Sequence, residues 1–236
     1  MSLSIILTCY NEAPCIFESY EQVESLLTLA NISHEIIIVD DGSTMEIQNS
    51  LKKNFENKKN IKLIFSETNE GRGSSITKGI KLSSKDYVGF IDTDLEISEY
   101  YILMLYAAIR EQNGDIIIGQ RIYQWQGKFY NVLRYLASRI YFYTINLILK
   151  LNFLDTETGI KIFKRDKILS IINSIKDKRW FWDTETIALS LKMKFKIIQT
   201  PVIVCRKNNK KSSVRLCRDT GRYILALWKY WGKSYE

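Results

Sequence analysis

The chain has 236 residues, of which 46% are hydrophobic and only 2 are proline, enough apolar sequence to bury the core of one large α/β domain. Its net charge of +8 is unevenly spread: residues 1–119 hold 10 basic and 18 acidic residues, whereas residues 120–236 hold 24 basic and 8 acidic residues. Four cysteines without Cys-x-x-Cys spacing argue against a zinc cluster, and the lone His34 has no obvious Ser or Cys partner for nucleophilic catalysis.

Apolar strands and helices alternate through the first half of the chain. Strands are expected at 4–8, 35–39, 61–65, 86–91 and 116–118. Helices are expected at about 15–30, 71–82 and 98–112, and a further helix after residue 43 is expected to end near 55. This order predicts an α/β fold with a mostly parallel sheet and helices on both faces. The GxGxxG fingerprint of dinucleotide-binding folds and the GxxxxGK[ST] fingerprint of P-loop proteins are both absent from the sequence.

Polar clusters follow several of these strands, where open α/β sheets bind their ligands. They are Tyr10-Asn11-Glu12, Asp40-Asp41, Glu70-Gly71-Arg72-Gly73 and Asp92-Thr93-Asp94. Each cluster alone is also compatible with a turn or a helix cap, but four of them at one edge favour a binding site. Asp92 and Asp94 leave their strand on one face and Glu96 follows, which is typical of oxygen ligands for Mg²⁺ or Mn²⁺.

The basic half is expected to meet an anionic partner. Residues 128–154 and about 219–232 read as basic, aromatic-rich helices that suit a membrane interface, with ordinary core helices as the alternative. No segment has the roughly 20 apolar residues that span a bilayer, and no signal peptide precedes the first strand. We therefore expect a peripheral protein at the cytoplasmic face of a membrane.

The polar clusters resemble those of the GT-A glycosyltransferases of family 2, in the order found there. The stretches 155–164, 182–185 and 212–215 are similar to those of the polyprenyl-phosphate sugar synthases, a subgroup with dolichyl-phosphate mannose synthases and dolichyl-phosphate glucosyltransferases. The resemblance implies a single GT-A catalytic domain over 1–236. Residues 1–119 would bind a nucleotide-sugar, and residues 120–236 would bind a polyprenyl-phosphate acceptor.

The resemblance also implies roles for individual residues. Asp92 and Asp94 would hold Mg²⁺ or Mn²⁺ against the donor diphosphate, and Glu96 stands where mannose synthases often carry glutamine. Asp183 would take the place of the catalytic aspartate. The expected nucleotide-sugar contacts are Tyr10, Asn11, Glu12, Asp40, Asp41, Gly71, Arg72 and Asp92. The expected acceptor-phosphate contacts are Arg121, Arg134, Ser138, Ser213 and Arg215.

The implied reaction is inverting transfer of a hexose to a lipid phosphate, with glucose from UDP-glucose favoured and mannose from GDP-mannose the main alternative. A lipid phosphate is already largely dianionic near neutral pH, with a second pKa of about 6, and needs no base. A sugar-hydroxyl acceptor would need one, and Asp183 is then the candidate. Asp183-Thr184-Glu185 also fits a helix N-cap with acids in the first turn.

Two further classes remain as alternatives. A metal-dependent nucleic-acid binder or nuclease would use the basic half, but it would leave the four polar clusters unexplained, so no nucleic-acid partner is expected. An inactive membrane-associated subunit would not need the metal-type carboxylates. A membrane-anchoring partner, a trimmed anchor and a homo-oligomer all remain open.

Overall fold

A computed structural model describes residues 1–123, 142–151 and 154–205, together with 223, 227 and 230. The strands are β1 Ser2–Cys9, β2 Ser33–Asp40, β3 Ile61–Phe65, β4 Tyr87–Ile91, β5 Ile116–Tyr123, β6 Ile160–Lys164 and β7 Ile197–Val204. The helices are α1 Ala13–Leu29, α2 Met45–Phe55, α3 Arg72–Leu82, α4 Tyr100–Glu111, α6 Arg165–Ile171 and α7 Trp182–Lys192. Residues 142–149 are also helical.

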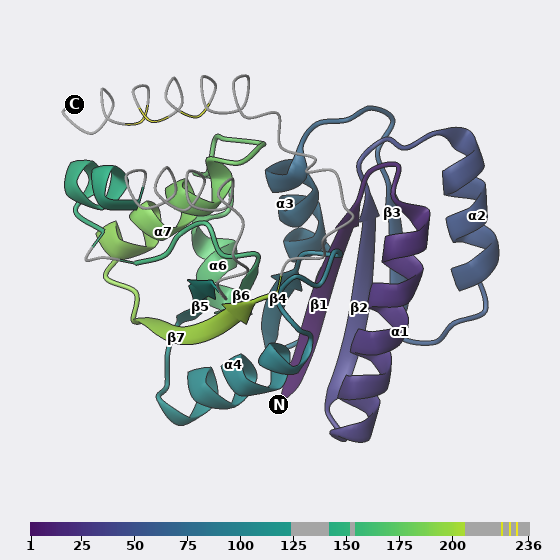
Figure 1. Cartoon of the computed structure of the whole chain (residues 1–236), viewed down its shortest axis with the longest axis horizontal. Helices are drawn as coiled ribbons and strands as arrows, with labels where there is room; N and C mark the ends of the chain where they lie inside the picture. Colours follow the sequence, from purple (N-terminus) through teal and green to yellow (C-terminus); the bar gives the residue numbers. More distant parts are fainter. Residues whose placement is uncertain (124–141, 152–153, 206–222, 224–226, 228–229, 231–236) are drawn as a thin grey trace.

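The seven strands form one sheet in the order β3-β2-β1-β4-β6-β5-β7 (Figure 1). The pairs β3–β2, β2–β1, β1–β4 and β5–β7 are parallel, and β6 runs antiparallel to both of its neighbours. The predicted mostly parallel α/β sheet is therefore confirmed. The four parallel strands β1 to β4 bring their carboxyl ends to one edge, where the first-half polar clusters follow them.

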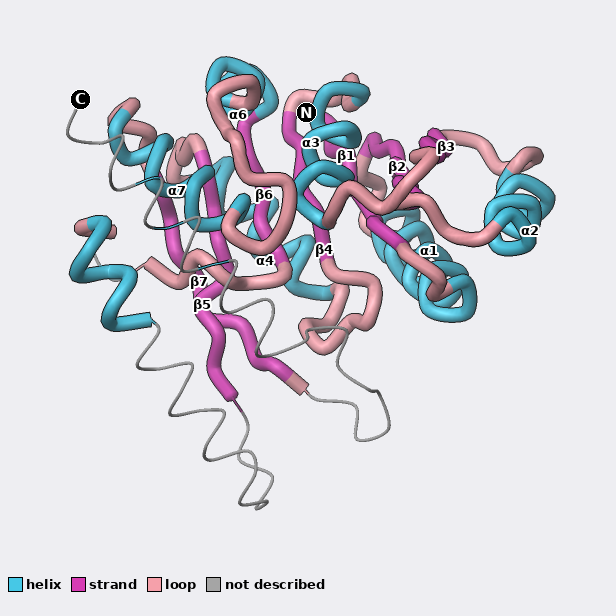
Figure 2. Tube along the Cα trace, turned by 90° about the horizontal axis from the view of Figure 1, so that it is seen from above, coloured by secondary structure: helices cyan, strands magenta, loops and turns pink. Residues whose placement is uncertain are grey.

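Alternating side chains of the strands build two hydrophobic cores, one on each face of the sheet. Ile5 and Ile36 pack with α1, α2 and α4, whereas Ile6 and Ile37 pack with α3, α6 and α7. Figure 2 shows α1 and α4 on one side of the strands and α3 and α6 on the other. Helices on both faces, as predicted, leave the loops at the carboxyl edge as the natural place for a site.

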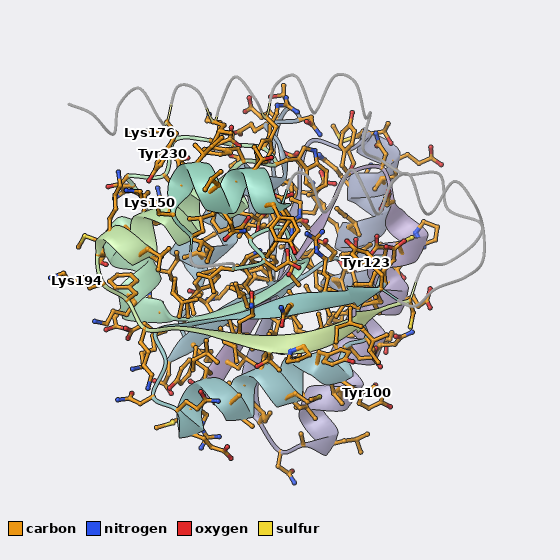
Figure 3. The ribbon with its side chains drawn as sticks, turned by 60° about the vertical axis from the view of Figure 1, so that its left-hand side comes forward. Tyr100, Tyr123, Lys150, Lys176, Lys194 and Tyr230 are labelled. Carbon is orange, nitrogen blue, oxygen red and sulfur yellow. The ribbon has the colours of Figure 1, made fainter. Side chains whose placement is uncertain are left out.

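The second half supplies two strands that the sequence analysis did not predict. Strand β6 lies between β4 and β5, and β7 is an edge strand. Pro201 has no N–H to donate, and an edge strand tolerates this because one of its sides needs no ladder hydrogen bonds. Beyond Ile118, β5 pairs only with β7, as far as Tyr123 opposite Val204. This two-stranded extension ends at Tyr123, far from Lys194 at the other end (Figure 3).

The predicted elements of the first half agree with the structure to within a few residues, apart from β5, which continues five residues beyond 118. Helix α1 begins earlier than predicted because Pro14 fits its first turn, where no amide donor is needed. Of the expected interface helices, 128–141 and nearly all of 219–232 lie outside the described residues. Within the described part, no helix is long and apolar enough to cross a membrane.

Candidate active site

Hydrogen bonds from and to Asn11 connect the loop after β1 with the loop after β2. The backbone N–H of Asn11 donates to Ser43 Oγ at 2.8 Å, and the N–H of Thr44 donates to Asn11 Oδ1 at 3.1 Å. Asn11 adopts a left-handed backbone with φ of 55°, which asparagine tolerates better than most residues. Tyr10 remains 48% exposed beside it, so the loop after β1 presents an aromatic ring to solvent.

Asp40 and Asp41 lie beneath these loops rather than on their surface. Asp40 is fully buried, and its Oδ2 accepts from the Ser43 N–H at 3.0 Å and from Gln48 Nε2 at 2.9 Å. Asp41 is 4% exposed, and its two oxygens accept the N–H groups of Glu70 and Gly71, each at 2.9 Å. In this conformation Asp40 organises the loop between β2 and α2, and Asp41 organises the loop that leads into α3.

Arg72, at the start of α3, joins two carboxylates that are far apart in the sequence. Its Nε and Nη2 donate to Asp92 Oδ1 at 2.9 and 2.7 Å, and its Nη1 donates to Asp183 Oδ2 at 2.6 Å. The guanidinium also lies 4.9 Å from the Phe90 ring centre and 5.6 Å from that of Trp180, positions that favour cation–π attraction. Three expected site residues, Arg72, Asp92 and Asp183, are thus brought together.

A buried lysine completes this chain of charges. The Lys161 side chain is fully buried in β6, and its Nζ donates to Asp183 Oδ1 at 2.5 Å and to the Thr158 carbonyl at 2.7 Å. Because Arg72 holds the other oxygen of Asp183, both oxygens of this carboxylate are bound by cations. Asp183 and Glu185 lie in the first turn of α7, as expected, but the N-cap is Phe181, two residues before Asp183.

Asp92 is positioned by close contact with Gly159. The Asp92 N–H donates to the Gly159 carbonyl at 2.9 Å, and a Cβ on Gly159 would come within 2.2 Å of Asp92 Oδ2. The third member of the motif is oriented locally, since Asp94 Oδ1 accepts the Glu96 N–H at 3.2 Å. Within the described residues, no three or more His, Cys, Asp or Glu side chains are grouped to hold a metal.

The donor set nevertheless suits a cation at Asp92. Asp92 Oδ1 already binds the positive guanidinium of Arg72, and the Asp92 side chain keeps 40% of its surface exposed. Carboxylates Asp92 and Asp94 are hard oxygen ligands, and Mg²⁺ typically uses one or two of these and completes its shell with phosphates and water. The described residues therefore fit a metal that is held partly by these carboxylates and partly by a diphosphate.

The local charges shift the ionisation of this cluster. Burial alone would lower the pKa of Arg72, but the adjacent Asp92 and Asp183 raise it above its ordinary value. Removal from bulk water raises the pKa of Asp92, and Asp94 adds to this rise, whereas Arg72 opposes it. Arg72 therefore remains a cation that balances carboxylates drawn close together.

The expected acceptor residue Arg121 forms a closed ion pair with Asp155. Its Nε donates to Asp155 Oδ2 at 2.9 Å, its Nη2 donates to Oδ1 at 2.7 Å, and its backbone N–H donates to Oδ2 at 3.0 Å. This pair joins the β5 extension to the loop before β6. The other expected acceptor contacts, Arg134, Ser138, Ser213 and Arg215, lie outside the described residues.

A buried cluster of hydroxyl groups lies next to Asp183 on α7. Thr184 Oγ1 is 2.7 Å from Thr156 Oγ1 and 2.6 Å from the Tyr223 hydroxyl, and Tyr223 also donates to Glu157 Oε1 at 3.2 Å. The Tyr223 ring packs edge-on against Phe181 at 5.1 Å. Tyr223 therefore contacts the helix that carries Asp183 through its hydroxyl group.

Sequence reasoning missed four residues that shape the site: Lys161, Asp155, Gly159 and Trp180. Lysine at a buried position of Ile160-Lys161-Ile162-Phe163 is an unusual signal, because a buried cation requires a partner. The motif at 155–164 contained three of the four residues, but nothing in one sequence shows that Lys161 meets Asp183, which lies 22 residues away.

Comparisons with known proteins relate the chain to glycosyltransferases. The family model described as Glycosyl transferase family 2 matches residues 4–171. The chain is 26% identical over 97% of its length to Glycosyltransferase AglD of Haloferax volcanii, but it spans only 37% of that relative's length. It is 24% identical over 96% of its length to Dolichyl-phosphate beta-glucosyltransferase of Dictyostelium discoideum and covers 76% of that relative.

Solved structures show the same fold. Glucosyl-3-phosphoglycerate synthase from Mycobacterium tuberculosis in complex with UDP aligns with a TM-score of 0.71 at 17% identity, covering 98% of this chain and 80% of that one. The same enzyme in complex with Mn²⁺, UDP-glucose and phosphoglyceric acid aligns with a TM-score of 0.68 at 16% identity, with the same coverage. At this identity the likeness establishes the fold, and the predicted GT-A architecture is confirmed.

Proposed function

Because the chain belongs to glycosyl transferase family 2, we propose that it transfers glucose from UDP-glucose to a polyprenyl monophosphate and inverts the anomeric centre. The observation that carries this proposal is the chain of contacts Lys161–Asp183–Arg72–Asp92 at the carboxyl edge of the sheet. The similarity to the Dictyostelium dolichyl-phosphate beta-glucosyltransferase over nearly the whole chain supports both the sugar and the acceptor.

The donor is proposed to lie along the loops after β1, β2 and β4. Tyr10, which is 48% exposed, is suited to stack on the base, while Asp40 shapes the loop after β2 and Asp41 shapes the loop that enters α3. Arg72, at the start of α3, is proposed to bind the diphosphate, because a helix N-terminus favours anions. A bound Mg²⁺ or Mn²⁺, held by Asp92 and Asp94, would neutralise charge on the leaving diphosphate.

The chemistry fits an acceptor that already carries negative charge. A phosphate oxygen attacks the anomeric carbon, the bond from that carbon to the diphosphate breaks, and UDP leaves with the bonding electrons. A phosphate monoester with a second pKa of about 6 is largely dianionic at neutral pH, so no proton has to be removed. Asp183, with both oxygens bound by Lys161 and Arg72, is suited to position the site rather than to act as a base.

The acceptor is proposed to approach the β5 extension near Arg121, since arginine binds phosphate oxygens through two parallel donors. Arg134, Ser138, Ser213 and Arg215 remain proposed contacts of the same phosphate. In the described conformation Arg121 is engaged with Asp155. A lipid phosphate would therefore compete with Asp155, or use a remaining donor of Arg121.

Peripheral contact with the cytoplasmic face of a membrane is part of the proposal. The helix at 142–149 exposes Tyr143, Leu147 and Ile148, with 50%, 82% and 39% of their surfaces accessible, and the exposed Lys150 follows it (Figure 3). An apolar helix face next to a cation suits the boundary between lipid tails and headgroups. Co-sedimentation with vesicles that contain anionic lipid tests this, and a Leu147→Asp variant should bind less.

The test of function is a transfer assay with labelled UDP-glucose and GDP-mannose, each offered to polyprenyl phosphate and to an oligosaccharide. Labelled lipid formed from UDP-glucose, and lost when EDTA is added, supports the proposal. Lipid labelled only from GDP-mannose would reassign the sugar. Label transferred only to the oligosaccharide would instead make the chain a polysaccharide-type transferase, and this alternative is favoured by a match of 35% identity over 100 residues to Poly-beta-1,6-N-acetyl-D-glucosamine synthase of Staphylococcus epidermidis.

A further inference from the structure

Arg72 already occupies the carboxylate on which the proposed metal site depends. Two of its nitrogens, Nε and Nη2, donate to the same atom, Asp92 Oδ1, at 2.9 and 2.7 Å. The other oxygen, Oδ2, faces Gly159 so closely that a Cβ there would lie 2.2 Å away. A cation that approaches Asp92 therefore competes with Arg72 for Oδ1.

Arg72 can leave Asp92 while the buried carboxylate of Asp183 keeps its cationic partners. Its Nη1 is bound to Asp183 Oδ2 at 2.6 Å, and Asp183 keeps Lys161 at its other oxygen at 2.5 Å. Lys161 is fully buried and also donates to the Thr158 carbonyl, so it stays in place when Arg72 moves. Arg72 therefore has one fixed partner, Asp183, and one partner that it can exchange, Asp92.

The protein alone supplies few ligands to a metal at this edge. Among the described residues no cluster of three His, Cys, Asp or Glu side chains could hold one. Mg²⁺ and Mn²⁺ prefer about six oxygen ligands, and Mg²⁺ commonly takes several from phosphates and water. A cation without a diphosphate would therefore gain little here and would lose Asp92 Oδ1 to Arg72.

We propose that Arg72 couples metal binding to donor binding. Without a diphosphate, Arg72 covers Asp92 and keeps the affinity for a free divalent cation low. When a nucleoside diphosphate arrives, its phosphates attract Arg72, and Asp92 becomes accessible to the cation that the phosphates also bind. This inference rests on the proposed function, because it takes the donor site at the carboxyl edge as given. By linkage, the factor by which UDP strengthens Mn²⁺ binding equals the factor by which Mn²⁺ strengthens UDP binding.

The test measures binding rather than turnover. Free Mn²⁺ is followed by electron paramagnetic resonance on the full chain, with and without UDP. For Arg72→Gln we expect Mn²⁺ alone to bind about tenfold tighter than in the wild type, because a charge-assisted bond that competes for Asp92 is lost. UDP should then strengthen Mn²⁺ binding by a smaller factor than in the wild type, because Asp92 no longer has to be uncovered.

A matched control separates this effect from a general loss of positive charge. Lys178 lies on the loop that packs against α3, its side chain is 67% exposed and its nearest carboxylate is Glu70 at 3.8 Å. Lys178→Gln removes the same charge without touching Asp92, and at physiological ionic strength it should change Mn²⁺ affinity by no more than about twofold. An equal gain in Arg72→Gln and Lys178→Gln would overturn the coupling.

The remaining outcomes are also decisive. If Mn²⁺ alone binds folded Arg72→Gln no more tightly than the wild type, the coupling proposal fails while the proposed function stands. If the wild type binds no Mn²⁺ even with UDP present, the metal-dependent donor site itself fails, and the coupling with it. Should circular dichroism show that Arg72→Gln is unfolded, Arg72→Lys decides, and its weaker hold on Asp92 should give a gain of about threefold.

Discussion

Two arginines in this molecule bind carboxylates in opposite ways. Arg121 donates three hydrogen bonds to one partner, Asp155, and uses both oxygens of that carboxylate. Arg72 divides three hydrogen bonds between Asp92 and Asp183, which come from different parts of the chain. To bind an acceptor phosphate, Arg121 would have to give up Asp155 or use a remaining donor. Arg72, in contrast, can exchange Asp92 and keep its contact with Asp183.

The pKa values of Asp155 and Asp92 are shifted in opposite directions. Burial alone would raise the pKa of Asp155, but Arg121 more than offsets this and holds the pKa of Asp155 below its ordinary value. The pKa of Asp92 is raised instead, because burial and the neighbouring Asp94 outweigh the attraction of Arg72. Arg121 thus favours the charged form of Asp155, whereas the surroundings of Asp92 disfavour its charged form.

The largest expected effect follows from removing the charge of Asp92. Asp92→Asn keeps the shape of the side chain but weakens both the bond to Arg72 and the proposed metal site. Loss of one preorganised electrostatic contact typically costs about 10²- to 10³-fold in kcat, and we expect a loss of that size in glucose transfer. Initial rates at saturating UDP-glucose measure it.

The comparison variant for this experiment is Asp166→Asn, in the exposed first turn of α6. It removes an equal charge from a position outside the site, so its rate should stay close to that of the wild type. A rate for Asp92→Asn within about threefold of the wild type would remove Asp92 from the proposed chemistry, because that change is well below the usual cost.

The next effect is on stability and tests the closed pair. Asp155→Asn leaves Arg121 with its charge largely enclosed, since the two side chains are 19% and 8% exposed. Breaking a buried pair from one side costs about 3–5 kcal/mol, and we expect about 3 kcal/mol from urea unfolding. The double variant Arg121→Met with Asp155→Leu should recover part of this loss, because it leaves no unpaired charge. A double variant less stable than Asp155→Asn would contradict this account.

A smaller effect on activity tests how closely Asp92 must be held. In Gly159→Ala the new Cβ would overlap Asp92 Oδ2 at 2.2 Å, so the carboxylate must move. We expect transfer to fall about tenfold, because a displacement of the order of 1 Å in a reacting group can cost up to about 10²-fold. Gly114→Ala is the matched control: its Cβ would meet the tip of Ile198 at 2.3 Å, away from the site, so stability but not transfer should fall.

The sequence predicted the first half of the fold well because its strands are short apolar runs and its polar clusters follow directly. Asp92 and Arg72 could be placed at one edge from the order of the elements alone. Their contact with Asp183 could not, since it depends on how α7 packs beside α3, more than 100 residues later. Strand β7 escaped prediction because Gln199, Thr200 and Pro201 interrupt its apolar residues, and the proline is tolerated because β7 is an edge strand.

The smallest expected effect concerns Glu35, near the amino end of β2. Glu35 is buried, but the lysine with which it forms an ion pair is partly exposed to solvent. Its partner Lys62 is 41% exposed and 2.9 Å away. Burial alone would raise the pKa of Glu35, but bonds from Lys62, Ser4 and Ser84 lower it below its ordinary value of 4.5. A lowered pKa gives stability that is fully present well above pH 4.5 and is lost as the pH falls through the folded-state pKa.

Glu35→Gln should therefore be less stable than the wild type at pH 7, and the difference should shrink as the pH falls below about 4.5. Its size should remain a fraction of that for Asp155→Asn, because solvent screens a half-exposed pair. Urea unfolding of both variants between pH 3 and 7 measures this. If Glu35→Gln lost as much unfolding free energy as Asp155→Asn, the exposure of one partner would not determine how much an ion pair contributes to stability. That result would weaken the distinction drawn between Arg72 and Arg121.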